Sequence, residues 1–246
     1  MDIGGFDLAM INVTLPDGTV NEYAAGITCA EVITDALGKK NGCLAALVDG
    51  QEKDMSHEIH QSCKVEGIKA ESDAGMYILR HSTAHLLAQA VTELYPDAKP
   101  TIGPAIDRGF YYDFAMEPIT EADLKPIQKK MQELARRNFT VERIELDDSE
   151  LREHFATNSY KLEIIDDKIG EGTGSTIYKQ GDWYDLCLGP HVSNTGKLMF
   201  CKLTSVSSAY WRGDQNREQL VRIYGIVEPT KDCLLYTSPS PRDSDQ

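Results

Sequence analysis

The stretch RHSTAHLLAQAV, residues 80–91, decides how the larger part of this chain is expected to fold. It places His81 and His85 four residues apart in an otherwise apolar run. Four residues is slightly more than one helical turn, so both imidazoles would leave the same side of a helix. Three interpretations are open at this point: the histidines belong to the core, bind a metal, or form part of a catalytic site.

The helix predicted around these histidines has an apolar stripe and a stop signal. Its apolar residues recur with the helical period, and the two histidines lie on the flank of the stripe rather than at its centre. The dipeptide Tyr95-Pro96 ends the helix, because proline disfavours helical backbone in the residue before it. The stripe residues are Ala84, Leu87, Val91 and Leu94.

Residues 8–70, upstream of that helix, have the pattern of a small mixed module. LAMINVTL alternates between apolar and polar residues and leads into the turn signal PDGT, and residues 20–23 complete a hairpin. Thr28 and Glu31 fit a capping box that opens a helix, which Gly38 ends. CLAALVDGQ and CKVEGIKA then predict further strands. This order of elements in about 60 residues is typical of a β-grasp, ubiquitin-like fold.

Downstream of the module the pattern is again mixed, so the fold class expected for the whole chain is α+β. ESDAG, residues 71–75, marks the expected boundary. Short strands are predicted around IGP and GFYYDF, followed by a charged helix near 121–138 whose start Pro126 shifts downstream. From residue 140 to 225 the pattern is mostly β, with one short helix near 149–156.

The last residues differ in kind from the rest. Residues 230–246 are rich in Ser, Pro and Asp and have no periodicity. The string TKDCLLYTSPSPRDSDQ resembles translated adapter sequence, so we expect an unstructured tail that is not native. The native part of the chain would then stop early, near residue 225.

The composition is that of a soluble globular protein with one large or two smaller domains. The 246 residues are 41% hydrophobic and 26% charged. No apolar run approaches the roughly 18–20 residues that cross a bilayer, and the N-terminal MDIGGFDLAM is not a secretory signal. The six cysteines form no CxxC pair and no regular framework, although a disulfide is still possible. We therefore expect reduced thiols, a cytoplasmic location and no membrane partner.

The charge balance restricts any role with nucleic acid. The chain has 25 Lys and Arg against 39 Asp and Glu, a net charge of −14. A chain of this charge repels nucleic acid at long range, whereas proteins that grip many phosphates are basic. Binding to nucleic acid would therefore use a local patch or depend on a neighbouring module.

A partner for the two histidines occurs far downstream, in DLCLGPHV, residues 185–192. Cys187 and His191 are also four residues apart, but the Gly189-Pro190 dipeptide between them enforces a turn instead of a helix. We predict that the two pairs converge on one pocket. Three histidines and one cysteine can also form a tetrahedral Zn²⁺ site, or a site of three ligands plus water.

Several motifs then occur in one order along the chain: HSTAHLL, IGPAIDRGFYYDF, SYK, DLCLGPHV, AYWRGD and RIYG. Together they resemble the N-terminal half of the bacterial-type threonyl-tRNA synthetase family, over about residues 10–225. The resemblance implies a TGS domain at residues 8–70 and a class II synthetase editing domain, of the threonyl and alanyl type, at residues 72–225. In that family the editing domain hydrolyses serine wrongly attached to threonine tRNA.

The resemblance also implies which residues form the site. Hydrolysis of the ester needs a positioned water, a stabilised oxyanion and a proton for the leaving oxygen, and His and Cys exchange protons near neutral pH. Lys161 would supply positive charge, Asp185 would hold the substrate ammonium, and Tyr112 would bind the sugar or serine. The catalytic positions by resemblance are His81, His85, Lys161, Asp185, Cys187 and His191, with Tyr112 as a substrate-binding residue.

For cofactors and partners the resemblance implies no metal in editing, and the 3′ end of threonine tRNA carrying serine as the substrate. Related free-standing alanyl-tRNA editing proteins do hold zinc at this constellation, here His81, His85, Cys187 and His191. ATP, Mg²⁺ and a catalytic zinc belong to the synthetase core, which would follow residue 225, and the full-length family enzyme is a homodimer. Nothing in this sequence resembles an ATP site, so we expect no aminoacylation.

Two other functions stay open on the sequence. One is a zinc-dependent, free-standing trans-editing hydrolase, and the other is a non-enzymatic module whose TGS part contacts nucleotide or RNA. The His and Cys residues argue against a pure binding module, which has no use for them. Taken singly, each site residue also has a structural interpretation: the histidines as core or surface residues, Cys187 as a small buried residue and Lys161 as a solvated surface residue.

Overall fold

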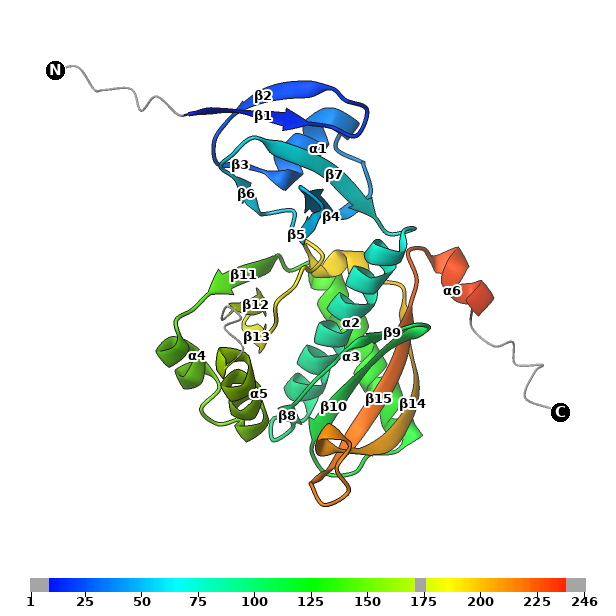
Figure 1. Cartoon of the computed structure of the whole chain (residues 1–246). Coiled ribbons are helices and arrows are strands. Elements are labelled where there is room, and N and C mark those ends of the chain that lie inside the picture. Colours follow the sequence, from blue (N-terminus) through cyan, green and yellow to red (C-terminus); the bar gives the residue numbers. More distant parts are fainter. Residues whose placement is uncertain (1–8, 171–175, 238–246) are drawn as a thin grey trace. The chain divides into compact units, whose positions relative to one another are not determined.

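The computed structural model describes residues 9–170 and 176–237, and Figure 1 shows its helices and strands. Backbone contacts divide the chain into two compact units, Met1–Gly75 and Met76–Gln246. The division lies beside the expected boundary, and helix α2 (Asp73–Leu94) begins just before it. Each unit combines helices with strands, as the expected α+β class requires.

The described part of the first unit has a five-stranded sheet in the order β2-β1-β7-β4-β5 and the helix α1 (Cys29–Leu37). Its two central strands, β1 and β7, pair in parallel, and the other neighbours are antiparallel, as expected for a β-grasp fold. A separate short pair joins β3 to β6. The strands are β1 (Met10–Thr14), β2 (Val20–Ala24), β3 (Ile27–Thr28), β4 (Cys43–Val48), β5 (Gln51–Lys53), β6 (Glu58–Ile59) and β7 (Cys63–Lys69).

Helix α1 begins and ends at the predicted signals. Thr28 Oγ1 accepts a hydrogen bond from the Glu31 N–H at 3.3 Å, and the Glu31 carboxylate accepts one from the Thr28 N–H at 2.9 Å. Gly38 ends the helix with φ 83°, a conformation that favours glycine. Val32 of the helix is buried in one apolar cluster with Val13 of β1, which attaches the helix to the sheet.

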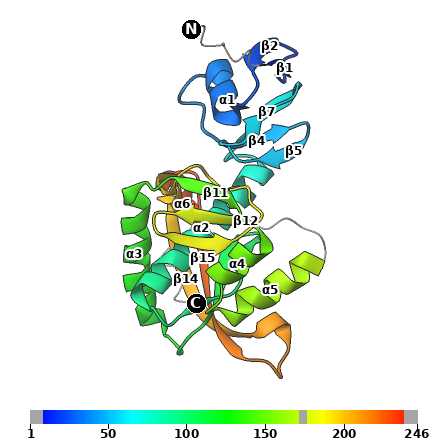
Figure 2. The same ribbon diagram turned by 90° about the vertical axis from the view of Figure 1, so that its left-hand side faces the viewer.

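The second unit contains two antiparallel sheets. The larger sheet has the order β14-β15-β10-β8, with β9 also paired to β10, and the smaller has the order β11-β12-β13. In Figures 1 and 2, α2 and α3 lie by the larger sheet, and α4 and α5 lie by the smaller one. The strands are β8 (Lys99–Pro100), β9 (Ala105–Ile106), β10 (Gly109–Ala115), β11 (Val141–Glu145), β12 (Thr176–Gln180), β13 (Trp183–Leu186), β14 (Cys201–Tyr210) and β15 (Gln219–Val227). The helices are α3 (Leu124–Arg137), α4 (Asp148–His154), α5 (Ser159–Gly170) and α6 (Lys231–Thr237), with 3-10 turns η1 (Glu121–Asp123), η2 (Thr195–Leu198) and η3 (Trp211–Gly213).

Helix α3 is the predicted charged helix, and it covers the edge of the larger sheet. Pro126 lies in its first turn, where a backbone N–H is not needed for the helical ladder. The Gln128 amide takes the place of a neighbouring strand: it donates to the Cys201 carbonyl at 3.1 Å and accepts from the Leu203 N–H at 2.7 Å. The side-chain amide thus satisfies backbone groups that an exposed edge would leave unpaired.

Helix α2 is buried on most of its sides. Of the predicted stripe, Ala84, Leu87 and Val91 are fully buried. The fourth stripe residue, Leu94, is 37% exposed, because it is the last residue of the helix. The burial of Leu79 and Leu86 outside the stripe shows that the helix packs on more than one face.

Two expectations from the sequence are wrong. The region from 140 to 225 contains a second helix, α5, where we expected mostly strands. Its start signal is Asn158, whose Oδ1 accepts hydrogen bonds from the N–H groups of Tyr160 and Lys161 at 3.2 and 3.3 Å. The other concerns the tail, where residues 231–237 form helix α6 instead of an unstructured segment.

Helix α6 also has a local start signal. Thr230 Oγ1 accepts a hydrogen bond from the Cys233 N–H at 3.3 Å, in the manner of an N-cap. Leu235 is 64% exposed, and the side chain of Tyr236 and residues 238–246 lie outside the described residues. Whether this tail is native therefore stays a prediction.

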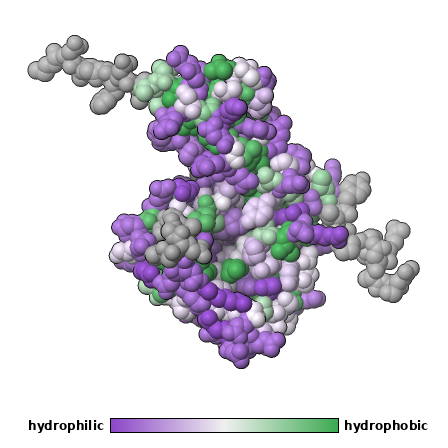
Figure 3. All heavy atoms as spheres, in the orientation of Figure 1, coloured by the Kyte–Doolittle hydropathy of each residue, from purple (hydrophilic) through white to green (hydrophobic). Residues whose placement is uncertain are grey.

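No disulfide joins any of the six cysteines, all of which lie in described segments. Hydrophilic side chains cover most of the face drawn in Figure 3, and the hydrophobic ones form small separate patches. Among the described helices, none combines the length and the apolar character needed to cross a bilayer.

Candidate functional site

The second unit brings all seven predicted site residues together. Six of them line one pocket with a volume of about 440 Å³. The seventh, His191, contacts one of the lining residues, with its Nε2 3.2 Å from Cys187 Sγ. The seven residues come from α2, β10, α5, β13 and the turn after β13. The six pocket residues are His81, His85, Tyr112, Lys161, Asp185 and Cys187.

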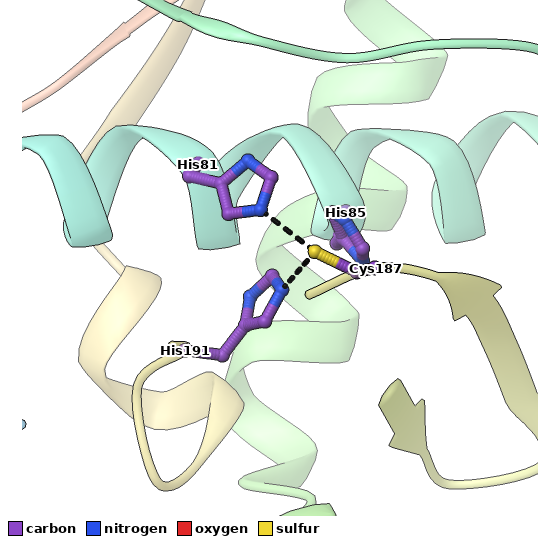
Figure 4. A group of neighbouring side chains, drawn as sticks. All are labelled: His81, His85, Cys187 and His191. Atoms are coloured by element: carbon purple, nitrogen blue, oxygen red, sulfur yellow. Dashed lines mark hydrogen bonds between the residues drawn. The ribbon is translucent and has the colours of Figure 1, made fainter. Parts of the chain in front are cut away.

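Four of these residues, His81, His85, Cys187 and His191, form what we call the His–Cys cluster (Figure 4). The Cys187 sulfur lies 3.0 Å from His81 Nε2 and 3.2 Å from His191 Nε2. The His85 ring stands edge-on to the other two imidazoles, with its centroid 5.1 Å from that of His81 and 4.4 Å from that of His191. The predicted convergence of the helical pair and the turn pair is therefore present.

Burial sets the protonation state of the cluster. Desolvation lowers the pKa of His81 and holds the pKa values of His85 and His191 well below the ordinary value, and the neighbouring imidazoles act in the same direction on the last two. Desolvation also raises the pKa of Cys187 to about 12, against the hydrogen bond that its sulfur receives from the Gly189 N–H. At neutral pH the cluster consists of uncharged imidazoles and a protonated thiol.

A second polar group lies beside the cluster. Lys161 Nζ is 2.6 Å from Asp185 Oδ1 and donates a hydrogen bond to the Tyr112 hydroxyl at 3.1 Å, while that hydroxyl donates to Asp185 Oδ2 at 2.5 Å. The side chains of Lys161 and Asp185 are only 3% and 2% exposed, so each buried charge depends on the other. These burials exclude the surface interpretation of Lys161.

The His–Cys cluster and the group of Lys161, Asp185 and Tyr112 meet at the Asp185 carboxylate. His85 Nε2 lies 3.9 Å from Asp185 Oδ2, too far for a hydrogen bond but close enough for an electrostatic contact. Burial, followed by the charge of Asp185, raises the pKa of Tyr112 well above its usual value. The Tyr112 hydroxyl therefore stays protonated and acts as a donor throughout the physiological pH range.

Close packing fixes the turn that carries Cys187 and His191. Gly189 has φ +74°, and a Cβ added there would lie 1.8 Å from the Tyr178 hydroxyl oxygen. The Tyr178 ring packs on His191 with centroids 4.3 Å apart. The backbone can approach Tyr178 this closely only because the residue is glycine, so Gly189 helps to determine where the side chains of Cys187 and His191 lie.

Gly103, which also lines the pocket, allows a similarly close approach. A Cβ at Gly103 would lie 2.1 Å from the Tyr112 ring, so the absence of a side chain lets the 101–104 segment pack directly on that ring. The sequence motif IGP contains this glycine, but no local pattern indicates that it faces Tyr112. We did not predict either glycine as a site residue.

Ser82 is another residue that the prediction missed. It follows His81 on α2 and is 2% exposed. Its Oγ lies 3.0 Å from His191 Nδ1 and accepts a hydrogen bond from the Val192 N–H at 3.1 Å. The motif HSTAHLL contains this serine, yet its partner is 109 residues away, so spacing along the chain could not identify the contact.

The cluster also has the donors of a metal site. One ligand atom from each of its four residues lies within 4.8 Å of the others. Three imidazole nitrogens and one sulfur are ligands that Zn²⁺ accepts in tetrahedral sites. The same atoms are explained without a metal by the hydrogen bonds between Cys187 and two of the histidines.

Comparison with known proteins assigns domains to both units. Residues 11–69 match the TGS domain, and residues 175–224 match the "Threonyl and Alanyl tRNA synthetase second additional domain". The second match contains Asp185, Cys187 and His191, but His81 and Lys161 lie outside it.

Curated relatives match nearly the whole chain. It is 48% identical over 227 residues to a protein of Alkalilimnicola ehrlichii named threonine–tRNA ligase, covering 90% of this chain and 35% of that protein. Proteins with the same name from Saccharophagus degradans and Rubrobacter xylanophilus are 48% identical over 226 residues and 44% identical over 228 residues. The chain spans 35% of the length of each of these relatives. Over nine tenths of its length this chain therefore matches proteins named threonine–tRNA ligase, as a TGS domain followed by an editing-type second additional domain.

Proposed function

We propose that this chain hydrolyses the ester bond that links serine to the 3′ end of threonine tRNA. The observation that carries the proposal is the meeting of the His–Cys cluster and the Lys161–Asp185–Tyr112 group in one pocket. The seven residues of the cluster and the group come from five separate segments of the chain. A structural core has no need for so many polar groups, since each of them must be desolvated.

The relatives' names supply the reason for such a reaction. A ligase that charges tRNA with threonine must reject serine, which lacks one methyl group, and one methyl(ene) provides only about 1–3 kcal/mol of discrimination. A second pocket that admits serine can exclude threonine by a clash with the extra methyl, and overpacking costs typically about 1–3 kcal/mol. The selectivity of the second pocket multiplies that of the aminoacylation pocket.

The His–Cys cluster is suited to handle the protons of the reaction. Hydrolysis removes a proton from the attacking water and delivers one to the ribose oxygen that leaves. Neutral imidazoles accept protons, and the cluster is held neutral by burial. We assign His81, His85, Cys187 and His191 to positioning the water and exchanging these protons.

The Lys161–Asp185–Tyr112 group is suited to hold the substrate. Lys161 uses two of its three N–H donors on Asp185 and Tyr112, so one remains for the developing oxyanion or a phosphate oxygen. Asp185 provides the negative charge that a substrate ammonium requires. Tyr112, as a permanently protonated donor, would bind the sugar or the serine hydroxyl.

The expected partner is tRNA, in the cytoplasm, where translation takes place. The net charge of −14 opposes tRNA binding, so we expect weak affinity that falls steeply with salt. The aminoacylation reaction belongs to the full-length relatives, and for this chain we propose ester hydrolysis alone.

A metal-dependent hydrolase is the second candidate, favoured by the four ligand atoms within 4.8 Å of one another. Three of the residues His81, His85, Cys187 and His191 would hold Zn²⁺ and leave the fourth position to a water, whose pKa such an ion lowers in hydrolytic sites. Metal analysis of the active protein and its sensitivity to chelators separate the two candidates. Full activity in protein free of metal excludes the metal-dependent hydrolase.

The proposed function is tested by deacylation of Ser-tRNA(Thr), with Thr-tRNA(Thr) measured in parallel at low salt. We expect hydrolysis of the serine ester and little hydrolysis of the threonine ester. Equal rates on both substrates would show that the pocket does not select by size. No hydrolysis of either substrate at saturating tRNA would refute the proposal.

A further inference from the structure

Ser82 makes two polar contacts, and together they restrict where its hydroxyl hydrogen points. Its Oγ accepts a hydrogen bond from the Val192 N–H at 3.1 Å and lies 3.0 Å from His191 Nδ1. A serine hydroxyl has one hydrogen to donate and two lone pairs to accept. With 2% exposure the side chain has little access to water, so the hydrogen needs an acceptor within the protein.

We propose that Ser82 is a positioning residue that fixes the tautomer of His191 and thereby the direction of hydrogen bonding through the His–Cys cluster. If Ser82 donates to His191 Nδ1, the hydroxyl hydrogen has an acceptor and the oxygen still accepts from the Val192 N–H. In the opposite arrangement, His191 donates from Nδ1 and the hydroxyl hydrogen has no acceptor among the described residues. A buried donor without a partner is unfavourable, so Nδ1 of the neutral His191 is the acceptor and its proton lies on Nε2.

The tautomer of His191 also sets the direction of the hydrogen bonds at the Cys187 sulfur. His191 Nε2–H points at Cys187 Sγ, 3.2 Å away, and the Gly189 N–H donates to the same sulfur at 3.3 Å. The sulfur therefore receives two hydrogen bonds. The remaining contact of Cys187 is His81 Nε2, at 3.0 Å, which must accept the thiol hydrogen. The hydrogen bonds run from Ser82 to His191, from His191 to Cys187 and from Cys187 to His81.

The direction of these hydrogen bonds determines which histidine can bind the attacking water, an inference that rests on the proposed function. The bare ring nitrogens of His191 and His81 are both occupied, by the Ser82 hydroxyl and the Cys187 thiol. His85 is then the histidine of the cluster whose ring makes no hydrogen bond within the described part of the chain, and it lines the pocket. Ser82 thus leaves His85 as the imidazole free to bind the attacking water.

The test is nitrogen-15 NMR of the histidine side chains in the full chain at neutral pH, because the chemical shifts of the two ring nitrogens report which one carries the proton. Histidine signals are assigned with single His→Gln variants. In the wild-type protein we expect His191 to be protonated on Nε2. A wild-type spectrum with the proton of His191 on Nδ1 would overturn the proposal.

The variant Ser82→Ala removes the hydroxyl without adding bulk. We expect it to move the His191 proton toward Nδ1 and to slow deacylation on the order of 10- to 100-fold, as loss of an orienting hydrogen bond typically does. Ser82→Thr, which keeps the hydroxyl, should restore the wild-type tautomer. An unchanged His191 spectrum in Ser82→Ala would contradict the proposal.

Thr83→Val is the matched control. Thr83 is equally buried and follows Ser82 on the same helix, but its hydroxyl donates to the Leu79 carbonyl, away from the cluster. This variant should leave the His191 spectrum unchanged. Since the spectra need no tRNA, they test the tautomer even if the chain proves not to hydrolyse Ser-tRNA(Thr), so the two proposals can fail separately.

Discussion

The two units of this chain bury different kinds of side chain. In the described part of the first unit, the buried side chains are all apolar, as in the cluster around Val13 and Val32. Among its described residues, the second unit buries thirteen polar or charged side chains, among them Lys161, Asp185 and His191. Apolar burial stabilises a fold, whereas burial of charge opposes it unless every group is paired. The buried side chains of the first unit thus favour stability, and the polar side chains buried in the second unit oppose it unless they are paired.

The largest expected effect comes from breaking the buried ion pair of the second unit. Asp185→Asn leaves Lys161 buried without its counter-charge, and loss of one partner of such a pair costs about 3–5 kcal/mol. Both tryptophans, Trp183 and Trp211, lie in the second unit, so denaturant unfolding followed by tryptophan fluorescence reports on this unit alone.

Two controls sharpen this measurement. Glu145→Gln breaks the exposed pair of Arg143 and Glu145 in the same unit, and should change the free energy of unfolding very little. The double variant Lys161→Met with Asp185→Leu removes both charges and should recover much of the loss. If Asp185→Asn lowered the free energy of unfolding as little as Glu145→Gln, the two buried charges would not depend on each other as we infer.

Gly189→Ala should have the next largest effect. The new Cβ would lie 1.8 Å from the Tyr178 hydroxyl oxygen, and the residue would keep a positive φ. We therefore expect the free energy of unfolding to fall by about 2–4 kcal/mol and deacylation to be lost. Gly213→Ala is the matched control, because Gly213 has φ +72° and nothing within 4 Å of its Cβ position. The free energy of unfolding of this variant should fall by only about 1–2 kcal/mol, because only the cost of a positive φ applies there. Equal losses in the two variants would mean that the contact with Tyr178 does not position the turn.

Acid should destabilise the second unit selectively. Its three cluster histidines have lowered pKa values in the folded state, while the unfolded chain takes up protons near the ordinary pKa of about 6.5. Their contribution to stability is therefore complete above that value and is lost as the pH falls through and below it. The thermal unfolding midpoint by tryptophan fluorescence should drop between about pH 7.5 and 5, and less so in His85→Gln. A midpoint independent of pH over this range would show that the histidines are not held neutral by the fold.

The smallest effect is expected in the first unit. Thr28→Ala removes the cap of α1 and should destabilise that unit by about 1 kcal/mol. Deacylation should be unchanged, because no reacting group lies in the first unit. NMR hydrogen exchange of the α1 amides would measure the local loss. A fall in the deacylation rate of Thr28→Ala, with the second unit still folded, would contradict the division of roles between the units.

Local signals account for the parts of the fold that the sequence predicted well. The Thr28–Glu31 capping box defined α1, and the spacing of His81 and His85 defined α2 and the face that carries the site. Four-residue spacing in a turn and in a helix also indicated that Cys187 and His191 belong with the first pair. The family resemblance then added Lys161 and Asp185, and the chemistry of the substrate suggested Tyr112. Local spacing alone does not connect these three residues.

The remaining features depend on contacts between distant segments. Ser82 acquires its role from His191, and Gly103 from Tyr112, through packing that no local pattern encodes. Helix α5 was missed because its apolar residues form a weak helical pattern, so its start depended on the single cap Asn158. The charge compensation of Lys161 by Asp185 likewise appears only when α5 and β13 are placed side by side.

The central claim is that the His–Cys cluster performs hydrolysis, and one comparison tests it most directly. Single-turnover deacylation of Ser-tRNA(Thr) is measured for the wild-type protein, Cys187→Ala and Cys201→Ala. Cys201 is a buried thiol of the same unit that contacts Gln128 and not the pocket, so it controls for loss of a buried sulfur. We predict that Cys187→Ala slows the reaction by about 100-fold or more, as loss of a proton-transfer group does, while Cys201→Ala stays near the wild-type rate. Wild-type rates in both variants, with both proteins folded, would contradict the account.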